Sequence, residues 1–466
     1  MAGREVLVSR SDEGHGFASP EAIVARLERL PLGAWHIRAR VIIGVATFFD
    51  GFDVLAMTFV LPVLAVLWKI APGEIGLILS SGFAGQLVGT LAAGWTAERI
   101  GRLRTATFTI AIFSVMSLCC ALAWSSESMM VFRFIQGIGL GGEVPVAAAY
   151  ISEIAHAKNR GRFFTLYELM FALGLLCTAV LAFLIIPWLG WRSMFYVGAA
   201  PAVLVLFLRR LLPESPRWLI SKGRLEDADR VVSAIEQKII ASGRPLPPPA
   251  GIESVVLPHS ELTSSSEIFE GIYLRRTLVA WVLWFSCYTV TYGLITWLPT
   301  LYRTVFHLSL AKALGYGLIT QSVGFLGSTA CAFLIDRVGR RRWFIIAFMG
   351  GGLSLVTLGM LGASRASAVL ACSSASFFFI STISLTLYLY TSELYPTRIR
   401  AFGCSVASAW LRLASAVGPG IVGFLLARKG LPSVFLLFGS VATLGGIVTS
   451  IGATETKGRL LEEISP

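Results

Sequence analysis

The stretch GWTAERIGRLR at residues 94–104 decides the fold, because part of it recurs in the second half of the chain. Positions 98–102 read ERIGR and positions 336–340 read DRVGR. Each copy places charged residues around a glycine and follows a long apolar run. The repeat therefore predicts that a charged turn ends an equivalent helix in each half of the chain.

A second motif repeats with nearly the same separation. Positions 150–153 read YISE and positions 390–393 read YTSE, and each glutamate is followed at the same spacing by an arginine, Arg160 or Arg400. Two independent motifs at nearly one offset indicate a duplicated unit with the same orientation in both copies. In transporters, parallel repeats of this kind enclose a site near the middle of the membrane, which opens alternately to either side.

The composition is that of a membrane protein. Of the 466 residues, 55% are hydrophobic and only 14% are charged, whereas a soluble domain carries about a quarter charged residues. Apolar runs of about 20 residues, enough to cross roughly 30 Å of hydrocarbon as helices, recur along the chain. The net charge of +12 does not indicate nucleic-acid binding, because the basic residues lie in short loops between apolar runs.

These runs predict an all-α membrane protein with twelve transmembrane helices in two pseudo-symmetric six-helix bundles. We expect spans near 41–67, 75–97, 105–125, 128–152, 163–187, 191–211, 277–301, 313–335, 343–362, 366–390, 402–427 and 432–452. The predicted regions are a cytoplasmic N-terminal segment (1–40), a first bundle (41–211), a cytoplasmic central loop with short helices (212–275), a second bundle (276–452) and a cytoplasmic tail (453–466). Residues 22–38 predict either a short helix on the membrane surface or a solvated leader.

The distribution of lysine and arginine predicts the orientation. With the N-terminus inside, 30 of the 39 basic residues lie in inner segments, seven lie in outer loops, and Arg133 and Arg412 lie within spans. This bias predicts a multi-pass protein of the inner membrane with both termini in the cytoplasm.

The sequence shows no metal-ligand spacing, phosphate-binding loop or nucleophile–base set, so we expect no enzyme activity, metal or cofactor. The seven cysteines lie mostly inside apolar runs, as small buried hydrophobes do. The glycine-rich stretch GIGLGG at 137–142 lies inside a predicted span, so it favours close helix packing over dinucleotide binding.

Several motifs resemble a known family. Residues 94–104 resemble the loop signature of the major facilitator superfamily. RFIQG at 133–137, PESPRWL at 213–219 and ETKG at 455–458 resemble its sugar-porter branch. The resemblance covers nearly the whole chain and implies the major facilitator fold, with helices of the central loop covering the inner mouth; we expect a monomer.

Two further motifs narrow the expected function. FDGFD at 49–53 is similar to the first-helix motif of aromatic acid:proton symporters and niacin-type transporters. LRLASAVGP at 411–419 is similar to the eleventh-helix arginine segment of those proteins and of organic-anion carriers. Two carboxylates and an arginine within the membrane suit an organic acid better than a neutral sugar.

Charged side chains inside the predicted spans are the candidate coupling groups. They are Asp50, Asp53, Arg133, Glu143, Glu168 and Arg412. Each costs about 2.5–3.5 kcal/mol to insert and so is expected to have a partner or a function. The resemblance implies that Asp53 pairs with Arg133, and separation of this pair would let Asp53 take up a proton. We assign proton coupling to Asp50, Asp53, Arg133 and Glu143, with static ion pairing between helices as the alternative.

Arg412 is the residue expected to bind the substrate, because its planar guanidinium matches the geometry of a carboxylate. The alternative is an internal pair with Glu168 or Asp50 from the other half. Further expected substrate contacts are Glu168, Gln136, Tyr288, Tyr292, Trp297 and Gln321. For the aromatic residues packing is the alternative, and for Glu168 it is a place in the inner gate.

Repeated charges at the predicted inner surface are candidate gating residues. They are Glu98, Arg99, Arg102, Glu153 and Arg160, with counterparts Asp336, Arg337, Arg340, Glu393 and Arg400. The resemblance implies that such residues form cross-helix ion pairs that hold the outward-open form and part when the inner side opens.

The combined interpretation is proton-coupled symport of a small organic anion, an aromatic or related carboxylate, across a lipid bilayer. Three alternatives remain open at this point: proton-antiport efflux of a drug-like or cationic compound, sugar or polyol symport with protons, and a transporter-like sensor that binds without transport.

Overall fold

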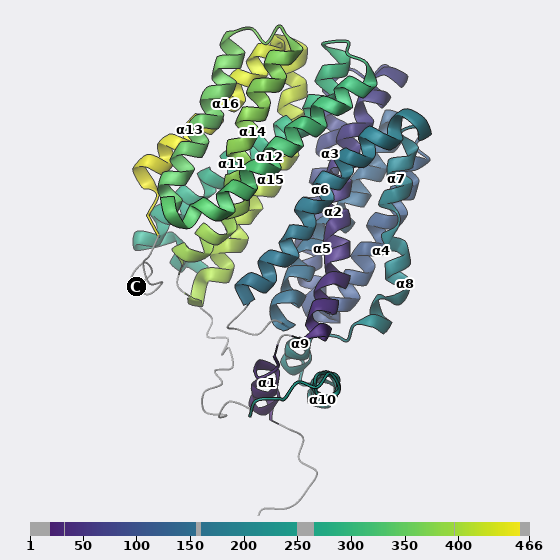
Figure 1. Ribbon diagram of the computed structural model, residues 1–466, viewed down its shortest axis with the longest axis vertical. Helices are drawn as coiled ribbons and strands as arrows, with labels where there is room; N and C mark the ends of the chain where they lie inside the picture. Colours follow the sequence, from purple (N-terminus) through teal and green to yellow (C-terminus); the bar gives the residue numbers. More distant parts are fainter. Residues whose placement is uncertain (1–18, 32, 155–159, 249–264, 396, 457–466) are drawn as a thin grey trace, which may run out of the picture.

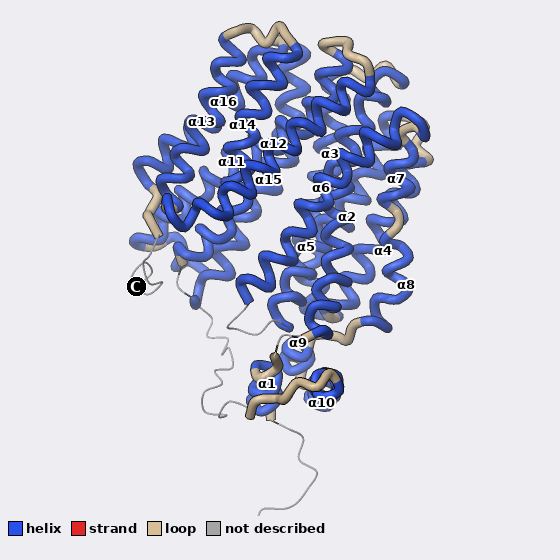
Figure 2. The backbone as a smooth tube through the Cα atoms, viewed as in Figure 1, coloured by secondary structure: helices blue, strands red, loops and turns tan. Residues whose placement is uncertain are grey.

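The computed structural model describes residues 19–31, 33–154, 160–248, 265–395 and 397–456. Within these residues the secondary structure is entirely helical (Figure 2). The long helices form two bundles that lie side by side, one from each half of the chain (Figure 1). The predicted all-α class and its duplicated architecture are confirmed.

The first bundle consists of α2 (Ala34–Leu67), α3 (Pro72–Ile100), α4 (Arg102–Ala121), α5 (Ser126–Ile154), α6 (Arg160–Leu189), α7 (Arg192–Gly198) and α8 (Pro201–Leu211). The second consists of α11 (Gly271–Thr304), α12 (Leu310–Val338), α13 (Arg340–Met360), α14 (Ala366–Leu394), α15 (Thr397–Lys429) and α16 (Leu431–Gly452). Outside the bundles lie α1 (Pro20–Glu28), α9 (Pro216–Ser221), α10 (Leu225–Ala241) and the 3-10 helix η3 (Ser265–Phe269).

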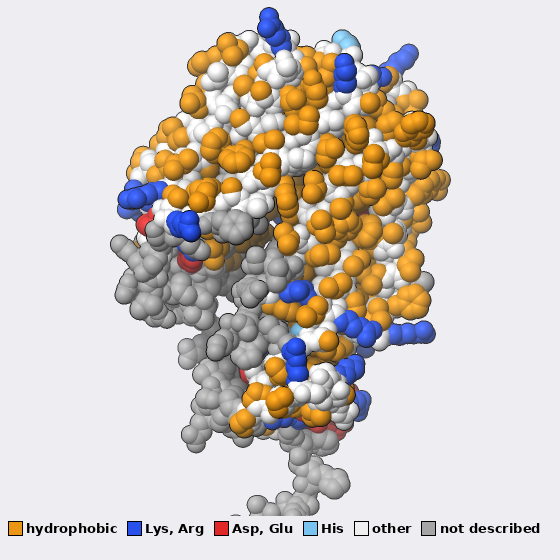
Figure 3. Space-filling model, in the orientation of Figure 1, with side chains coloured by type: hydrophobic (Ala, Val, Ile, Leu, Met, Phe, Trp, Pro, Cys, Tyr) orange, Lys and Arg blue, Asp and Glu red, His pale blue; other side chains and the backbone are white. Residues whose placement is uncertain are grey.

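Ten helices in the described part of the chain are long and apolar enough to cross a membrane. Several exceed the predicted spans: α2 and α11 have 34 residues each, or about 50 Å at 1.5 Å per residue. Apolar side chains cover the flanks of both bundles, while Lys and Arg side chains gather towards the ends (Figure 3). Exposed residues such as Leu91, Phe108 and Leu326 are therefore positioned to face lipid.

The predicted span 191–211 is two helices, α7 and α8, rather than one. Pro201 stands in the first turn of α8 and lacks the N–H group that a continuous helix needs. The N–H of Ala200 donates to the carbonyl of Val197 at 3.0 Å, in a tighter turn that separates the two helices. Proline thus interrupts the sixth span just after Gly198.

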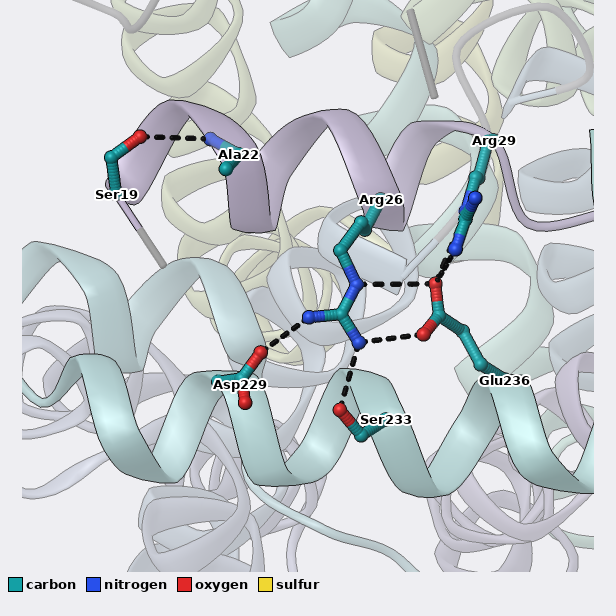
Figure 4. Close-up of polar contacts among 7 residues, drawn as sticks. All are labelled: Ser19, Ala22, Arg26, Arg29, Asp229, Ser233 and Glu236. Carbon is teal, nitrogen blue, oxygen red and sulfur yellow. Dashed lines mark hydrogen bonds and ion pairs between the residues drawn. The ribbon is translucent and has the colours of Figure 1, made fainter. Parts of the chain in front are cut away.

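Residues 22–38, for which the sequence predicted either a short surface helix or a solvated leader, belong to two helices. Helix α1 ends at Glu28, and α2 begins at Ala34, inside the segment that we expected to precede the first span. Helix α1 packs on α10 (Figure 4). Predicted features at 1–18, 249–264 and 457–466 lie outside the described residues.

Ion pairs hold α1 on α10. Arg26 pairs with Asp229, and its Nη2 lies 2.6 Å from Oε2 of Glu236 and 2.7 Å from Oγ of Ser233 (Figure 4). Arg29 donates to Oε1 of the same glutamate at 2.6 Å. Because two guanidinium groups converge on one mostly buried carboxylate, Glu236 is the centre of this contact.

The two bundles pack most closely near the end opposite α1, α9 and α10, and their ribbons diverge towards those helices (Figure 1). A Cβ atom placed on Gly76 of α3 would lie 2.8 Å from the carbonyl oxygen of Pro419 in α15. One placed on Gly423 would lie 2.6 Å from the carbonyl oxygen of Pro72. Small residues therefore allow α3 and α15 to meet backbone to backbone at that end.

Candidate functional site

Three polar side chains lie near the middle of helices that face one another across the bundle interface. Asp50 lies near the middle of α2, Gln86 is the central residue of α3, and Arg412 lies near the middle of α15. At a rise of about 1.5 Å per residue, each is roughly 20 Å or more from both ends of its helix. The three side chains therefore lie near the centre of the apolar layer.

Arg412 is bonded to the opposite bundle. Its Nη1 donates to Oε1 of Gln86 at 2.5 Å. The carboxyl group of Asp50 and the hydroxyl of Tyr292 also lie within the electrostatic influence of the guanidinium. Of the two internal partners considered from the sequence, Asp50 is thus a neighbour rather than a direct ion-pair partner, and the side chain of Glu168 lies outside the described part of the structure.

Asp50 is only 3% exposed. Its Oδ1 is buried and has no hydrogen-bond partner among the described residues. A buried carboxylate oxygen without a partner is costly, so Asp50 is a candidate for a functional role.

Asp53 and Arg133 are connected through Gln136. The amide Nε2 of Gln136 donates to Oδ2 of Asp53 at 3.1 Å, and its Oε1 accepts from Nη1 of Arg133 at 2.6 Å. Within the described residues this relay replaces the direct Asp53–Arg133 ion pair that the family resemblance implied. The physical reason is the spacing on α5: Gln136 lies three positions after Arg133 and shares its helix face.

The other oxygen of Asp53 faces the interruption of the sixth span. A Cβ atom placed on Gly198 would lie 2.8 Å from Oδ1 of Asp53 and 2.7 Å from Oγ of Ser117. The side chain of Asp53 is fully buried. Only a residue without a side chain leaves room for the carboxylate here, so Gly198 at the end of α7 is needed for the placement of Asp53.

Glu143 belongs to a third polar cluster. The hydroxyl of Thr47 in α2 lies 3.0 Å from Oε1 of Glu143 in α5 and 2.7 Å from the hydroxyl of Tyr167 in α6. The three residues join three helices of the first bundle. Glu143 is thus close to the helix that carries Asp50 and Asp53, but it contacts different side chains.

The aromatic candidates on α11 form a column. The ring centroids of Tyr288 and Tyr292 are 6.0 Å apart and those of Trp284 and Tyr288 are 5.4 Å apart, both in stacked arrangements. Phe83 of the first bundle meets Tyr292 edge-on at 5.0 Å. Tyr292 therefore touches the other bundle, and it also lies near Arg412.

Trp297 and Gln321 are buried in the second bundle. Nε1 of Trp297 and Nε2 of Gln321 have no hydrogen-bond partner among the described residues. No contact described here joins them to Arg412, so they stand apart from the central cluster.

The candidate gating charges form matching ion pairs in the two bundles. Nε of Arg102 lies 3.1 Å from Oε1 of Glu153, and Nη2 of Arg340 lies 3.2 Å from Oε1 of Glu393. These pairs join α4 to α5 and α13 to α14, so each lies within one bundle. The side chains of Arg160, Asp336 and Arg400 lie outside the described part of the structure.

The remaining gating candidates occupy surface positions. Arg99 lies over the ring of Trp95 at 3.9 Å, and Arg337 is exposed. The backbone carbonyl of Glu98 accepts from Nε1 of Trp218 at 3.0 Å, which ties the end of α3 to α9.

Two further acids repeat the same symmetry and were absent from the sequence-based site. Oε1 of Glu214 accepts from the backbone N–H of Leu103 at 2.9 Å, and Oε1 of Glu455 accepts from the backbone N–H of Arg340 at 2.9 Å. Each carboxylate thus caps the first turn of a helix that begins after the charged turn, α4 or α13. The sequence motifs could have pointed to these two acids, because Glu214 lies in PESPR and Glu455 lies in ETKG, both of which resemble family motifs.

Gln86 was not among the residues predicted from the sequence, although Gln136 and Gln321, two other amides within predicted spans, were. An amide inside an apolar run was the available signal. Among the described residues no cluster of three or more His, Cys, Asp or Glu side chains has the arrangement of a metal site.

Two membrane-embedded bundles with charged groups between them define a multi-pass membrane transporter. The chain belongs to the sugar (and other) transporter family, whose model matches residues 54–466. The family and its named members identify a transporter rather than an enzyme.

Relatives and a solved structure agree with that family. The niacin transporter NiaP of Acinetobacter baylyi is 33% identical over 447 residues, which cover 95% of this chain and 99% of that protein. A gallate transporter of Pseudomonas putida is 31% identical, covering 89% of this chain and 91% of that protein. The xylose transporter XylE from E. coli has the same fold, with a TM-score of 0.70 at 19% identity over 92% of this chain and 100% of that one.

Proposed function

We propose that this protein is a proton-coupled symporter of a small aromatic or related monocarboxylate. In this proposal Arg412 receives the substrate carboxylate, Tyr292 and its aromatic column flank the ring, and Asp50 and Asp53 take up the coupling proton.

The observation that carries the proposal is the environment of Arg412. This guanidinium is partly exposed although it lies in the middle of α15, and its hydrogen-bond partner among the described residues is a neutral amide. A charge at this depth is costly unless an anion can neutralise it. A substrate carboxylate is such an anion, and its two oxygens match the planar guanidinium.

The acidic side chains supply the proton-binding groups. Asp50 has a buried oxygen without a partner among the described residues, and Asp53 is held through a neutral amide rather than by direct contact with Arg133. Proton binding by either carboxylate removes a buried negative charge. One proton with one monoanion is an electroneutral pair, driven by about 1.36 kcal/mol per pH unit.

The names of the relatives are consistent with this chemistry. Niacin and gallate are both aromatic acids, and they are the named substrates of two relatives that align over most of this chain. A sugar lacks the carboxylate that would neutralise Arg412.

The orientation follows from the basic residues. Because 30 of 39 Lys and Arg side chains lie in the segments assigned to the inside, we infer that the end carrying α1, α9 and α10 faces the cytoplasm. The close packing of Gly76 and Gly423 then lies on the outer side, which corresponds to a conformation closed to the outside.

Uptake by proteoliposomes under an imposed inward pH gradient tests the proposal. We expect radiolabelled nicotinate, benzoate or 4-hydroxybenzoate to accumulate and the external medium to become more alkaline, whereas xylose does not accumulate. Arg412→Lys keeps the positive charge but loses the planar guanidinium that can donate two parallel hydrogen bonds to a carboxylate. This variant should raise the KM for the acid at least tenfold. Uptake of a cation or a sugar in place of every acid would overturn the assignment.

A further inference from the structure

In this structure Arg412, the residue proposed to bind the substrate carboxylate, is hydrogen-bonded to Gln86. Gln86 is 1% exposed, and its Oε1 accepts from Nη1 of Arg412 at 2.5 Å. The two residues come from α15 and α3, one from each bundle. An amide oxygen therefore occupies a donor that a substrate carboxylate would need.

The backbone of Gln86 is held firmly against α5. A Cβ atom placed on Gly141 would lie 2.0 Å from the carbonyl oxygen of Gln86, and one placed on Gly137 would lie 3.0 Å from its backbone nitrogen. Thr90, one turn along α3, donates its hydroxyl to the carbonyl of Gly141 at 2.8 Å. Because glycines bring α3 and α5 into backbone contact, Gln86 is mounted on a rigid pair of helices.

We propose that Gln86 is an internal competitor for Arg412, occupying the guanidinium when no substrate is bound and yielding it to the substrate carboxylate. The inference rests on the proposed function. A hydrogen bond from a guanidinium to a charged carboxylate is stronger than one to a neutral amide, so an acid displaces Gln86. A neutral ligand that offers only an amide or hydroxyl oxygen gains no advantage over the bond already present.

The bond between Gln86 and Arg412 satisfies the polar groups of both residues while the site is empty. The buried end of Gln86 keeps its acceptor satisfied, and Arg412 retains a partner while the site is empty. Every ligand must also displace the Gln86 bond, so only a ligand that binds Arg412 more strongly than an amide does, as an anion does, occupies the site readily. Gln86 therefore lowers the affinity of every ligand that binds Arg412, and the choice between an acid and a neutral ligand lies in the bond that each makes to the guanidinium.

Removal of the acceptor gives the decisive test. Gln86→Leu preserves the side-chain size but offers no hydrogen-bond acceptor to Arg412. With the purified full-length protein, the Kd for nicotinate measured by calorimetry should fall about tenfold, because the ligand no longer displaces an internal bond. The Kd for nicotinamide, the neutral counterpart of nicotinate, should fall by a similar factor. An unchanged or weaker Kd for nicotinate in Gln86→Leu would overturn the competitor role.

A second variant acts in the opposite direction. Gln86→Glu places a carboxylate on Arg412, and nicotinate binding should weaken by at least a hundredfold while the protein remains folded. Ser81→Ala is the matched control on the same helix, because the hydroxyl of Ser81 donates to the carbonyl of Ile78 within α3; its Kd should equal that of the wild type. Nicotinate binding by Gln86→Glu at wild-type affinity would contradict the proposal.

A double-mutant cycle separates this inference from the proposed function. Thermal unfolding of Gln86→Leu, Arg412→Met and the double variant requires no ligand. If the wild type binds none of the acids, the proposed function fails, and non-additive melting temperatures still support the occupancy of Arg412 by Gln86. Additive melting temperatures would overturn that occupancy whatever the substrate is.

Discussion

Asp53 and Arg133 are joined by one amide rather than by direct contact: Gln136 donates to the carboxylate and accepts from the guanidinium. The orientation of that amide is fixed by the two charges, because only one end of it can donate. A rotation of Gln136 would release both partners together. The relay is therefore a point at which a change in helix position can alter the charge state of Asp53.

Gln136→Leu should remove the relay and leave two buried groups without their partner. We expect the free energy of unfolding to fall by about 1–3 kcal/mol, and accumulation of the acid against a gradient to be lost. Thermal unfolding and proteoliposome uptake measure the two effects. Gln237→Leu, an exposed glutamine on α10, is the control and should behave as the wild type. Uphill uptake by Gln136→Leu at the wild-type rate would exclude a coupling role for this residue.

Asp53→Asn should uncouple transport without abolishing it. The neutral side chain can still accept a hydrogen bond from Gln136, so substrate exchange between two equal pools should persist. Because no proton can be carried at this position, uptake driven by a pH gradient should fall at least tenfold. Counterflow and gradient-driven uptake in the same proteoliposomes measure both properties, and normal accumulation by the variant would assign the proton to another group.

Gly101→Ala should destabilise the protein by about 1–3 kcal/mol. The φ angle of Gly101 is 113°, and a Cβ atom placed there would lie 2.4 Å from Oε2 of Glu214, which caps α4. Gly94→Ala is the matched control, because Gly94 lies in α3 and no heavy atom lies within 4 Å of its added Cβ. The melting temperature should fall for Gly101→Ala and stay constant or rise for Gly94→Ala. Equal melting temperatures would contradict the strain at Gly101. Gly339, with φ of 97° and facing Glu455, should respond in the same way.

The docking of α1 on α10 should depend on pH through Glu236. Burial alone would raise the pKa of Glu236, but the hydrogen bonds from Arg26 and Arg29 outweigh it, so the pKa lies below its ordinary value. A carboxylate with a lowered pKa stabilises the folded state above its unfolded pKa of about 4.3, and that contribution is lost as pH falls through the folded pKa. We expect about 1 kcal/mol of docking free energy, present at pH 6–8.

Amide hydrogen exchange of α1 between pH 8 and pH 4 measures this effect. Glu236→Gln should expose α1 at all pH values and remove the difference between neutral and acidic conditions. Glu226→Gln is the control, because Glu226 lies in the first turn of α10, the helix that also carries Glu236. This variant should leave the exchange profile of α1 unchanged. Identical protection of α1 in the wild type and in Glu236→Gln at pH 7 would show that these ion pairs do not hold the helix.

The sequence by itself determined the class of fold. Hydrophobic runs of membrane-spanning length, the repeated charged motifs at 98–102 and 336–340, and the bias of Lys and Arg all act locally, because the cost of inserting each residue depends on its own chemistry. It also singled out Asp50 and Arg412, which the structure brings near each other, because charges within apolar runs are conspicuous.

Only the tertiary structure decided which side chains meet. The partner of Arg412 is Gln86, and Gln136 separates Asp53 from Arg133. Neutral amides leave no charge signal in a sequence. Their partners also depend on the rotation and separation of helices that are far apart along the chain. Those are set by backbone contacts such as Gly76 against Pro419, and no local pattern encodes them.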